Sequence, residues 1–184
     1  MNARRFFLLL TSGILALKSI LSARAEETAE EGLRHMKQVV RNSFPGVRQL
    51  SSADLAAWLA DTNRVQPVLL DVRTHPEFMV SHLRGAWQID PKTPATDTLN
   101  TLPLARPVVV YCSVGYRSSE YAARMIKEGF TNVVNLEGSL FQWANEGRPL
   151  SSNGQPAALV HPYNATFGKL LKPELRPARW ETAK

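Results

Sequence analysis

The chain has 184 residues, 44% hydrophobic and 21% charged, with one cysteine, which excludes collagen-like, low-complexity and disulfide-stapled proteins. The length predicts one globular domain. Residues 1–25 contribute +4 to the net charge of +6, because 18 of the 22 basic and all 16 acidic side chains lie beyond them. The remaining +2 is too small to predict a nucleic-acid partner.

Residues 1–25 have the three parts of an export signal. The pair Arg4 and Arg5 is followed by an apolar run, Phe6–Leu17, and by the small-x-small cleavage site Ala23-Arg24-Ala25. As a helix the run would extend about 18 Å, short of a ~30 Å hydrocarbon core, so we expect membrane contact only through the signal. Two arginines before Phe-Phe-Leu favour twin-arginine export, and an ordinary secretory signal is the alternative. Both predict a periplasmic protein cleaved after Ala25.

An N-terminal helical extension is predicted over residues 26–49. Within Glu26–Arg41, Leu33, Met36 and Val40 recur at spacings of three and four, which is typical of a short amphipathic helix. The sequence Phe-Pro-Gly at positions 44–46 is expected to end it.

Strands and helices alternate over residues 50–150, which we expect to form the folded domain. In the first half we predict a helix from Ser51, a strand at Val68–Val72, a helix at Pro76–Leu83 and a strand at Ala86–Ile89. A loop follows at Pro91–Pro107, with one helical turn around Leu99–Leu104. In the second half we predict a strand at Val108–Cys112, a helix at Ser118–Lys127, a strand at Val133–Leu136 and a helix at Ser139–Glu146. This pattern predicts an α/β fold, a small doubly wound parallel sheet with helices on both faces, which binds ligands at the carboxyl ends of its strands. Residues 151–184 hold four prolines and no predicted strand or long helix, so we expect a tail or strap.

Cys112 stands where an apolar strand ends and a helix is about to begin. An unpaired thiol outside the cytosol is either buried and inert or in use. A short loop before a helix start turns backbone N–H groups inward, and the helix dipole and Arg117 add positive charge. Such surroundings lower the pKa of a cysteine, so we predict that Cys112 is an ionised nucleophile.

The loop from Cys112 to Arg117 resembles that of the rhodanese domains, in which Cys, four residues and Arg close around a persulfide. Further signatures occur in the same order as in that family. They are Leu70-Asp71-Val72-Arg73, Glu77-Phe78, His82-Leu83, Gly85-Ala86, Val134-Asn135-Leu136-Glu137-Gly138, Trp143 and Gly147-Arg148-Pro149. The chain departs from the family at Gly138-Ser139, where two glycines are more usual.

The resemblance implies a sulfurtransferase that moves a sulfane sulfur from a small anionic donor such as thiosulfate to a thiol or cyanide, through a persulfide on Cys112. No cofactor is expected, and a protein could accept the sulfur. One alternative is a sulfur carrier or protein-binding module with little turnover. A phosphatase is a further alternative, but phosphatases of this architecture place five residues between Cys and Arg, whereas Cys112 and Arg117 enclose four.

The resemblance and the loop together give the candidate residues their roles. Cys112 is the nucleophile, and the expected substrate-binding residues are Arg117, Ser113, Val114, Gly115, Tyr116, Ser118 and Arg73. Arg73 either recruits the anionic donor or pairs with Asp71. Glu77 and His82 are expected to hold the local structure. His82 has no second ligand at a suitable spacing, so we predict no metal site.

Overall fold

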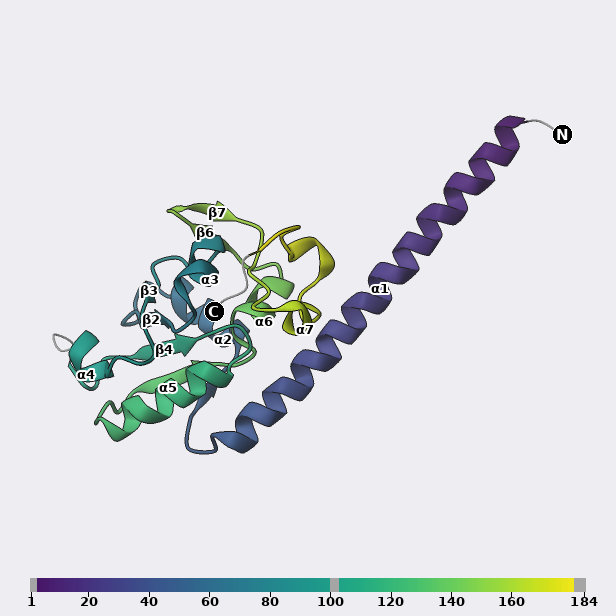
Figure 1. The fold of residues 1–184 in the computed structure, drawn as a ribbon. Helices are drawn as coiled ribbons and strands as arrows, with labels where there is room; N and C mark the ends of the chain where they lie inside the picture. Colours follow the sequence, from purple (N-terminus) through teal and green to yellow (C-terminus); the bar gives the residue numbers. More distant parts are fainter. Residues whose placement is uncertain (1–2, 100–102, 181–184) are drawn as a thin grey trace.

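The computed structural model describes the backbone of residues 3–99 and 103–180 (Figure 1). The helices are α1 (Ala3–Ser43), α2 (Ser52–Ala60), α3 (His75–Val80), α4 (Ala95–Thr98), α5 (Tyr116–Lys127), α6 (Ser139–Asn145) and α7 (Ala165–Gly168), and Pro173–Leu175 forms a 3-10 turn. The strands are β1 (Gln49–Leu50), β2 (Val68–Asp71), β3 (Trp87–Gln88), β4 (Val108–Tyr111), β5 (Val133–Leu136), β6 (Leu150–Ser152) and β7 (Gln155–Ala157). The predicted α/β fold is therefore confirmed.

The main sheet has five parallel strands in the order β1-β5-β4-β2-β3. The chain runs outward from β2 to β3, returns to β4 beside β2, and then runs outward to β5 on the other side. The strand order thus reverses between β2 and β4, and the carboxyl ends of these strands are where open α/β sheets bind ligands. Asp71 ends β2 and Tyr111 ends β4, and the two residues are paired in register.

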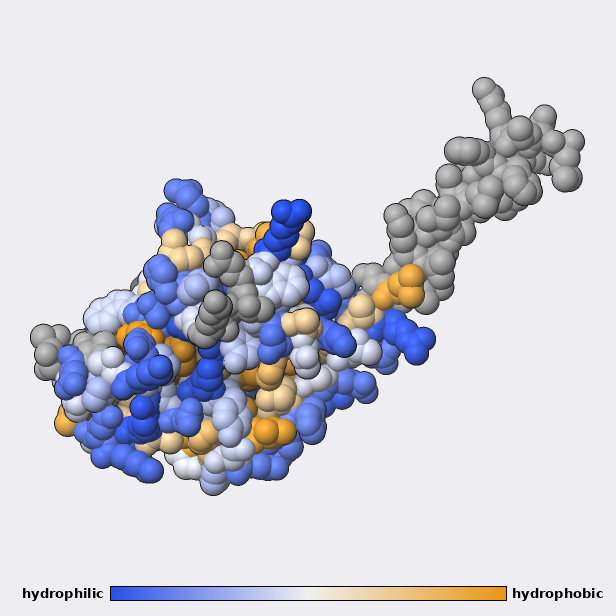
Figure 2. Space-filling view, viewed as in Figure 1, coloured by the Kyte–Doolittle hydropathy of each residue, from blue (hydrophilic) through white to orange (hydrophobic). Residues whose placement is uncertain are grey.

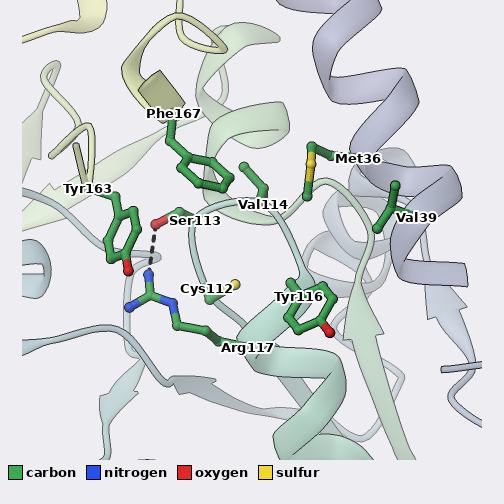
Figure 3. Close-up of a pocket in the computed structure, with 9 residues that line it drawn as sticks. All are labelled: Met36, Val39, Cys112, Ser113, Val114, Tyr116, Arg117, Tyr163 and Phe167. Carbon is green, nitrogen blue, oxygen red and sulfur yellow. Dashed lines mark hydrogen bonds between the residues drawn. The ribbon is translucent and has the colours of Figure 1, made fainter. Parts of the chain in front are cut away.

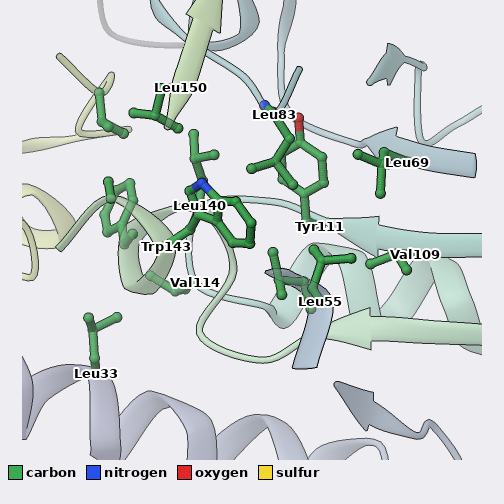
Figure 4. Packing of buried hydrophobic residues seen from close by; sticks show 14 of the residues in the cluster. Leu33, Leu55, Leu69, Leu83, Val109, Tyr111, Val114, Leu140, Trp143 and Leu150 are labelled. Atoms are coloured by element: carbon green, nitrogen blue, oxygen red, sulfur yellow. Dashed lines mark hydrogen bonds between the residues drawn. The ribbon is translucent and has the colours of Figure 1, made fainter. Parts of the chain in front are cut away.

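Successive side chains of the central strands enter two separate cores, one on each face of the sheet, because side chains alternate along a strand. Leu69 and Val109 belong to the core that includes residues of α2 and α6 (Figure 4). Leu70 and Val110 belong to the core that includes residues of α4 and α5. Helices therefore cover both faces of the sheet, as predicted.

The helix α1 is continuous from Ala3 to Ser43 and joins the predicted signal to the predicted extension. Its C-terminal half packs on the domain through Ala29, Leu33 and Val40, which are buried, whereas its N-terminal half projects away (Figure 1). Side chains of residues 3–20, on which the export prediction depends, lie outside the described residues. Within the described part of the chain, no helix is long and apolar enough to cross a membrane.

The structure corrects the prediction that residues 151–184 contain no strand. Strands β6 and β7 form an antiparallel hairpin whose turn residues, Asn153 and Gly154, both have positive φ, as a two-residue hairpin turn requires. The Asn-Gly pair was the signal that predicts it, although the strands themselves are short and polar. Leu171 is fully buried and Phe167 packs against the core, so this segment is a strap held on the domain.

Other elements also differ from the predictions; for example, α3 spans His75–Val80 rather than Pro76–Leu83. Helix α5 begins at Tyr116 rather than Ser118, because Gly115 takes a left-handed conformation directly before it. The helical turn in the long loop lies at Ala95–Thr98 rather than Leu99–Leu104, a stretch that includes residues outside the description. The two-residue edge strand β1 was not predicted, because two residues are too few to show a period.

The surface facing the viewer in Figure 2 is largely hydrophilic, with apolar residues in small patches. Exposed apolar side chains such as Val65, Met79 and Trp87 come from different elements of the fold. Single apolar residues of this kind are ordinary on a protein surface.

Candidate active site

The loop after β4 holds Cys112 at the base of the site. Its backbone is fixed from α6, because the N–H groups of Leu140 and Phe141 donate to the carbonyl oxygens of Cys112 and Ser113 at 3.1 and 3.0 Å. Gly115, with φ of 105°, then turns the chain into α5. A Cβ atom on Gly115 would lie 3.2 Å from the Asn135 amide nitrogen, so glycine is favoured by both conformation and space.

The Cys112 thiol is buried, but its surroundings differ from those of an inert core cysteine. The Gly115 N–H donates to Sγ at 3.2 Å, and the first turn of α5 lies beside it. Burial raises the pKa of the thiol, but the charge of Arg117 and hydrogen bonds from Ser118 and Gly115 outweigh burial and lower the pKa below its ordinary value. The thiolate, which is the nucleophilic form, is therefore favoured.

Arg117 and Glu77 form an ion pair beside the loop. The Arg117 nitrogens donate to the two Glu77 carboxylate oxygens at 3.0 and 2.8 Å, and Arg117 also donates to Ser113 Oγ at 3.0 Å. Glu77 is placed by its own helix, because its carboxylate accepts from the backbone N–H and the hydroxyl of Thr74 at the start of α3. Burial raises the pKa of Glu77, but Arg117, Arg73 and Thr74 together lower it to about 2. Glu77 is therefore ionised at neutral pH and holds Arg117 in place.

Arg73 and Asp71 form a second ion pair that is closed to solvent. The Arg73 Nε and Nη2 atoms donate to the Asp71 carboxylate at 2.9 and 2.7 Å, and Nη2 also donates to the Ser81 carbonyl at 2.6 Å. Both side chains are fully buried. Of the two predicted roles of Arg73, the structure therefore shows pairing with Asp71. The donor-binding role is corrected, because a buried guanidinium that does not line the pocket cannot meet a donor from solvent.

His82 makes local contacts directly after α3. Its Nδ1 lies 2.9 Å from the Phe78 carbonyl, and its ring stacks on the Phe78 ring at 3.8 Å between centroids. Its backbone bridges to Ser151 of β6. Within the described part of the chain, no group of three or more His, Cys, Asp or Glu side chains could hold a metal ion.

Ser139 is a residue at the site that the sequence did not identify as functional. Its hydroxyl accepts the Cys112 N–H at 3.1 Å and donates to the Leu136 carbonyl at 3.0 Å. The residue has φ of 51°, in the left-handed region that favours glycine. The departure from two glycines at Gly138-Ser139 therefore places a hydroxyl that fixes the backbone of the cysteine.

A pocket of about 300 Å³ opens over the loop. Its floor comes from the predicted loop residues Cys112, Ser113, Val114, Tyr116 and Arg117. Val114 is buried, whereas Tyr116 is 42% exposed and packs edge-on against Phe44, with 5.1 Å between ring centroids. Gly115 and Ser118 lie behind the floor and contribute backbone support. The hydroxyl of Ser118 donates to Asn135 at 2.6 Å.

The walls of the pocket come from both ends of the chain (Figure 3). Met36 and Val39 extend from α1, and Tyr163 and Phe167 extend from the C-terminal strap. The Arg117 guanidinium lies 4.7 Å from the centre of the Tyr163 ring. The spacing of Met36 from Leu33 and Val40 predicts an amphipathic helix, but no local pattern shows which surface that helix covers.

Comparisons with known proteins identify the family of the domain. Residues 51–146 match the model of the rhodanese-like domain family. A protein named sulfurtransferase from Allochromatium vinosum is 34% identical over 104 residues, which cover 56% of this chain and 94% of that protein. A probable adenylyltransferase/sulfurtransferase, MoeZ, from Mycobacterium tuberculosis is 34% identical over 102 residues, but these cover only 25% of its length.

A solved structure supports the fold independently. The crystal structure of a Bacillus halodurans protein superposes with a TM-score of 0.56, at 22% identity, over 77% of this chain and 98% of that one. At this identity the likeness concerns the fold alone. The matched family segment spans residues 51–146, so the four wall residues Met36, Val39, Tyr163 and Phe167 lie outside it.

Proposed function

The chain belongs to the rhodanese-like domain family, and on that premise we propose that it transfers a sulfane sulfur through a persulfide on Cys112. The donor is a small anion such as thiosulfate, and the acceptor is a thiol or cyanide. The observation that carries the proposal is the placement of the Cys112 thiol, which has a lowered pKa, receives the Gly115 N–H and lies at the floor of an open pocket.

In the first step the Cys112 thiolate attacks the outer, divalent sulfur of thiosulfate. A bond forms between Sγ and that sulfur, the S–S bond of the donor breaks, and its electron pair leaves with sulfite. The step needs no histidine base, because the lowered pKa of Cys112 favours the thiolate and sulfite is a weak base. Arg117, whose side chain is 28% exposed, can donate to the sulfonate oxygens from the pocket side.

The persulfide then carries its negative charge on the outer sulfur, one bond away from Sγ. The Gly115 N–H and the start of α5 stabilise that charge, as backbone N–H groups and a helix N-terminus do for other anions. In the second step a thiophile attacks the outer sulfur, and the electron pair of the Sγ–S bond returns to Cys112. The two half-reactions form a double-displacement cycle.

Intact mass spectrometry after exposure to thiosulfate tests the persulfide. We expect one added sulfur on the parent protein, removed by cyanide, and none on Cys112→Ser. Saturable thiosulfate consumption with cyanide is expected from an enzyme, whereas a single stoichiometric burst would contradict turnover and leave a sulfur carrier. Absence of added sulfur from the folded parent would overturn the proposal.

We further propose that the protein is exported to the periplasm and cleaved after Ala25. The charge and apolar pattern of residues 1–25 supports this, and Ala29 is the first α1 residue that is buried among the side chains described. Cleavage would therefore leave the packed part of α1 on the domain. Expression of the full chain in a bacterium, followed by N-terminal sequencing of the periplasmic fraction, should give Glu26. Loss of export in the Arg4→Lys/Arg5→Lys variant would indicate the twin-arginine route, and retention of residues 1–25 would contradict cleavage.

A further inference from the structure

The pocket over Cys112 is more apolar than inorganic substrates require. Met36, Val39, Val114 and Phe167 present aliphatic or aromatic groups to it. Met36 and Phe167 also pack against the core, so these two wall residues are held in place by the fold. Preformed pockets lined mainly by apolar side chains, with few polar groups, are typical of sites for organic ligands. Thiosulfate and cyanide have no apolar group to fill such walls.

Most of the charged groups near Arg117 lie outside the pocket. Among the pocket-lining residues that the structure describes, Arg117 is the only charged one apart from the Cys112 thiolate, and Glu77 already pairs with it. A second depression of about 310 Å³ shares Arg117 but is lined also by Lys92 and Arg124, with Glu120 as its acidic residue. The cationic side chains other than Arg117 therefore lie outside the pocket that holds Cys112, whose remaining walls are mainly apolar.

We propose that the pocket binds the apolar group of an organic thiol, and that Met36, Val39 and Phe167 determine the preference for this acceptor over cyanide and small polar thiols. This inference rests on the proposed persulfide on Cys112. It assigns a role to the two extensions that flank the family domain, because both supply walls to the same pocket.

The transfer is balanced without a further reactant. The thiol sulfur attacks the outer sulfur of the Cys112 persulfide anion, so a new S–S bond forms while the Sγ–S bond breaks. The electron pair of the broken bond returns to Sγ as the thiolate. The proton of the thiol ends on the product, an organic hydropersulfide, and the Cys112 thiolate is regenerated.

The test uses the full chain loaded with one sulfur from thiosulfate. The rate of sulfur loss is measured by mass spectrometry with phenylmethanethiol, with 2-sulfanylethanol, and with cyanide. The rate for each thiol is divided by its rate with a small disulfide, so that intrinsic reactivity cancels. We expect phenylmethanethiol to be favoured over 2-sulfanylethanol by about tenfold or more, which corresponds to burial of an aromatic group.

Variants of the walls make the test specific. Met36→Ser and Phe167→Ser should each lower the ratio of the phenylmethanethiol rate to the cyanide rate by about five- to tenfold. The matched control is Met79→Ser, which makes the same change at an exposed methionine of α3 away from the pocket and should leave the ratio as in the parent. Val39→Thr, which is nearly isosteric, should lower the ratio by about threefold and covers the case in which a serine variant fails to fold.

The outcomes separate the two proposals. If no sulfur is loaded by thiosulfate, the proposed function fails. If sulfur is loaded and cyanide removes it, but the folded wall variants keep the parent ratio, the function stands and the inference on the pocket is overturned. A parent protein that shows no preference between the two thiols would overturn the inference in the same way.

Discussion

Two arginine–carboxylate pairs lie near the carboxyl ends of β2 and β4, and they differ mainly in their access to solvent. Arg73 and Asp71 are two residues apart and both fully buried. Arg117 and Glu77 are forty residues apart, and the Arg117 side chain is 28% exposed while Glu77 is buried. Both carboxylates accept short hydrogen bonds from their arginine. The two pairs therefore have the same chemistry, and access to solvent decides what each arginine can contact.

The two ion pairs differ in what they can contact. In a fully buried ion pair the arginine cannot leave its carboxylate to bind a ligand, and the main effect of the pair is to fix one local structure. A pair at the edge of a pocket keeps one side of the guanidinium available and also acts on the nearby thiol. The charge of Arg117 lowers the pKa of Cys112, whereas the charge of Arg73 lowers the pKa of Glu77.

The largest effect is expected from breaking the buried pair. Arg73→Met leaves Asp71 buried without its cation, which costs about 3–5 kcal/mol of unfolding free energy. Urea unfolding measures the change. Arg84→Met is the matched control, since Arg84 is exposed and nearby, and should change stability by less than about 0.5 kcal/mol. Equal stability of the two variants would contradict the structural role of the buried pair.

The carboxylate of the second pair gives a pH dependence. The pKa of Glu77 is lowered from 4.5 to about 2 in the folded chain, so its ionised form stabilises the fold above the unfolded-state pKa. This stability should be lost as the pH falls from about 4.5 towards about 2. Glu77→Gln should flatten that part of the urea-midpoint profile, whereas Glu120→Gln, at an exposed site on α5, should keep it. A parent-like slope in Glu77→Gln would contradict the assignment.

Removal of the partly exposed Arg117 should act on the Cys112 thiol. In Arg117→Met the charge that favours the Cys112 thiolate is lost, so the thiol pKa rises and less thiolate is present at neutral pH. We expect persulfide formation with thiosulfate to slow by about tenfold or more. Alkylation rates measured across pH should show their midpoint at higher pH. Lys127→Met, at the end of the same helix, is the control, and an unshifted alkylation midpoint in Arg117→Met would show that Arg117 does not set the pKa.

The smallest effect concerns a neutral contact at the same cysteine. Ser139→Ala removes two hydrogen bonds and keeps a side chain at positive φ, so we expect a loss of about 1–2 kcal/mol. Ser139→Gly loses the same bonds but relieves the backbone strain by about 1 kcal/mol, so it should melt closer to the parent. Melting temperatures of the three proteins provide the check. The reverse order of the two variants would mean that the backbone at this position is not strained.

The elements of the central domain were predictable because their signals are local. The strand Val133–Leu136 agrees with the structure at both ends, and Ser51 caps α2 by accepting the Asp54 N–H, as the hydroxyl three residues before an acid indicates. The hairpin at Asn153-Gly154 was missed although its signal was present. Its strands are polar and short, so they show no apolar period.

The candidate site was predictable in part. Cys112, Gly115 and Arg117 lie within one short loop, and their chemistry could be argued from sequence spacing. The sequence does not decide the role of Arg73, because Asp71 followed by Arg73 is compatible both with an ion pair and with a donor bound by Arg73. The structure decides between them, because the Arg73 side chain is buried with Asp71 and donates to the Ser81 carbonyl.

The amino-acid sequence by itself determined the reactive loop and the alternation of strands and helices, because each depends on neighbours a few residues apart. Only the tertiary structure decided which arginine faces the sulfur and which side chains form the pocket walls. Met36 and Phe167, which lie near opposite ends of the chain, line the same pocket as Cys112. Contacts of that kind follow from the packing of whole elements, which local periodicity does not specify.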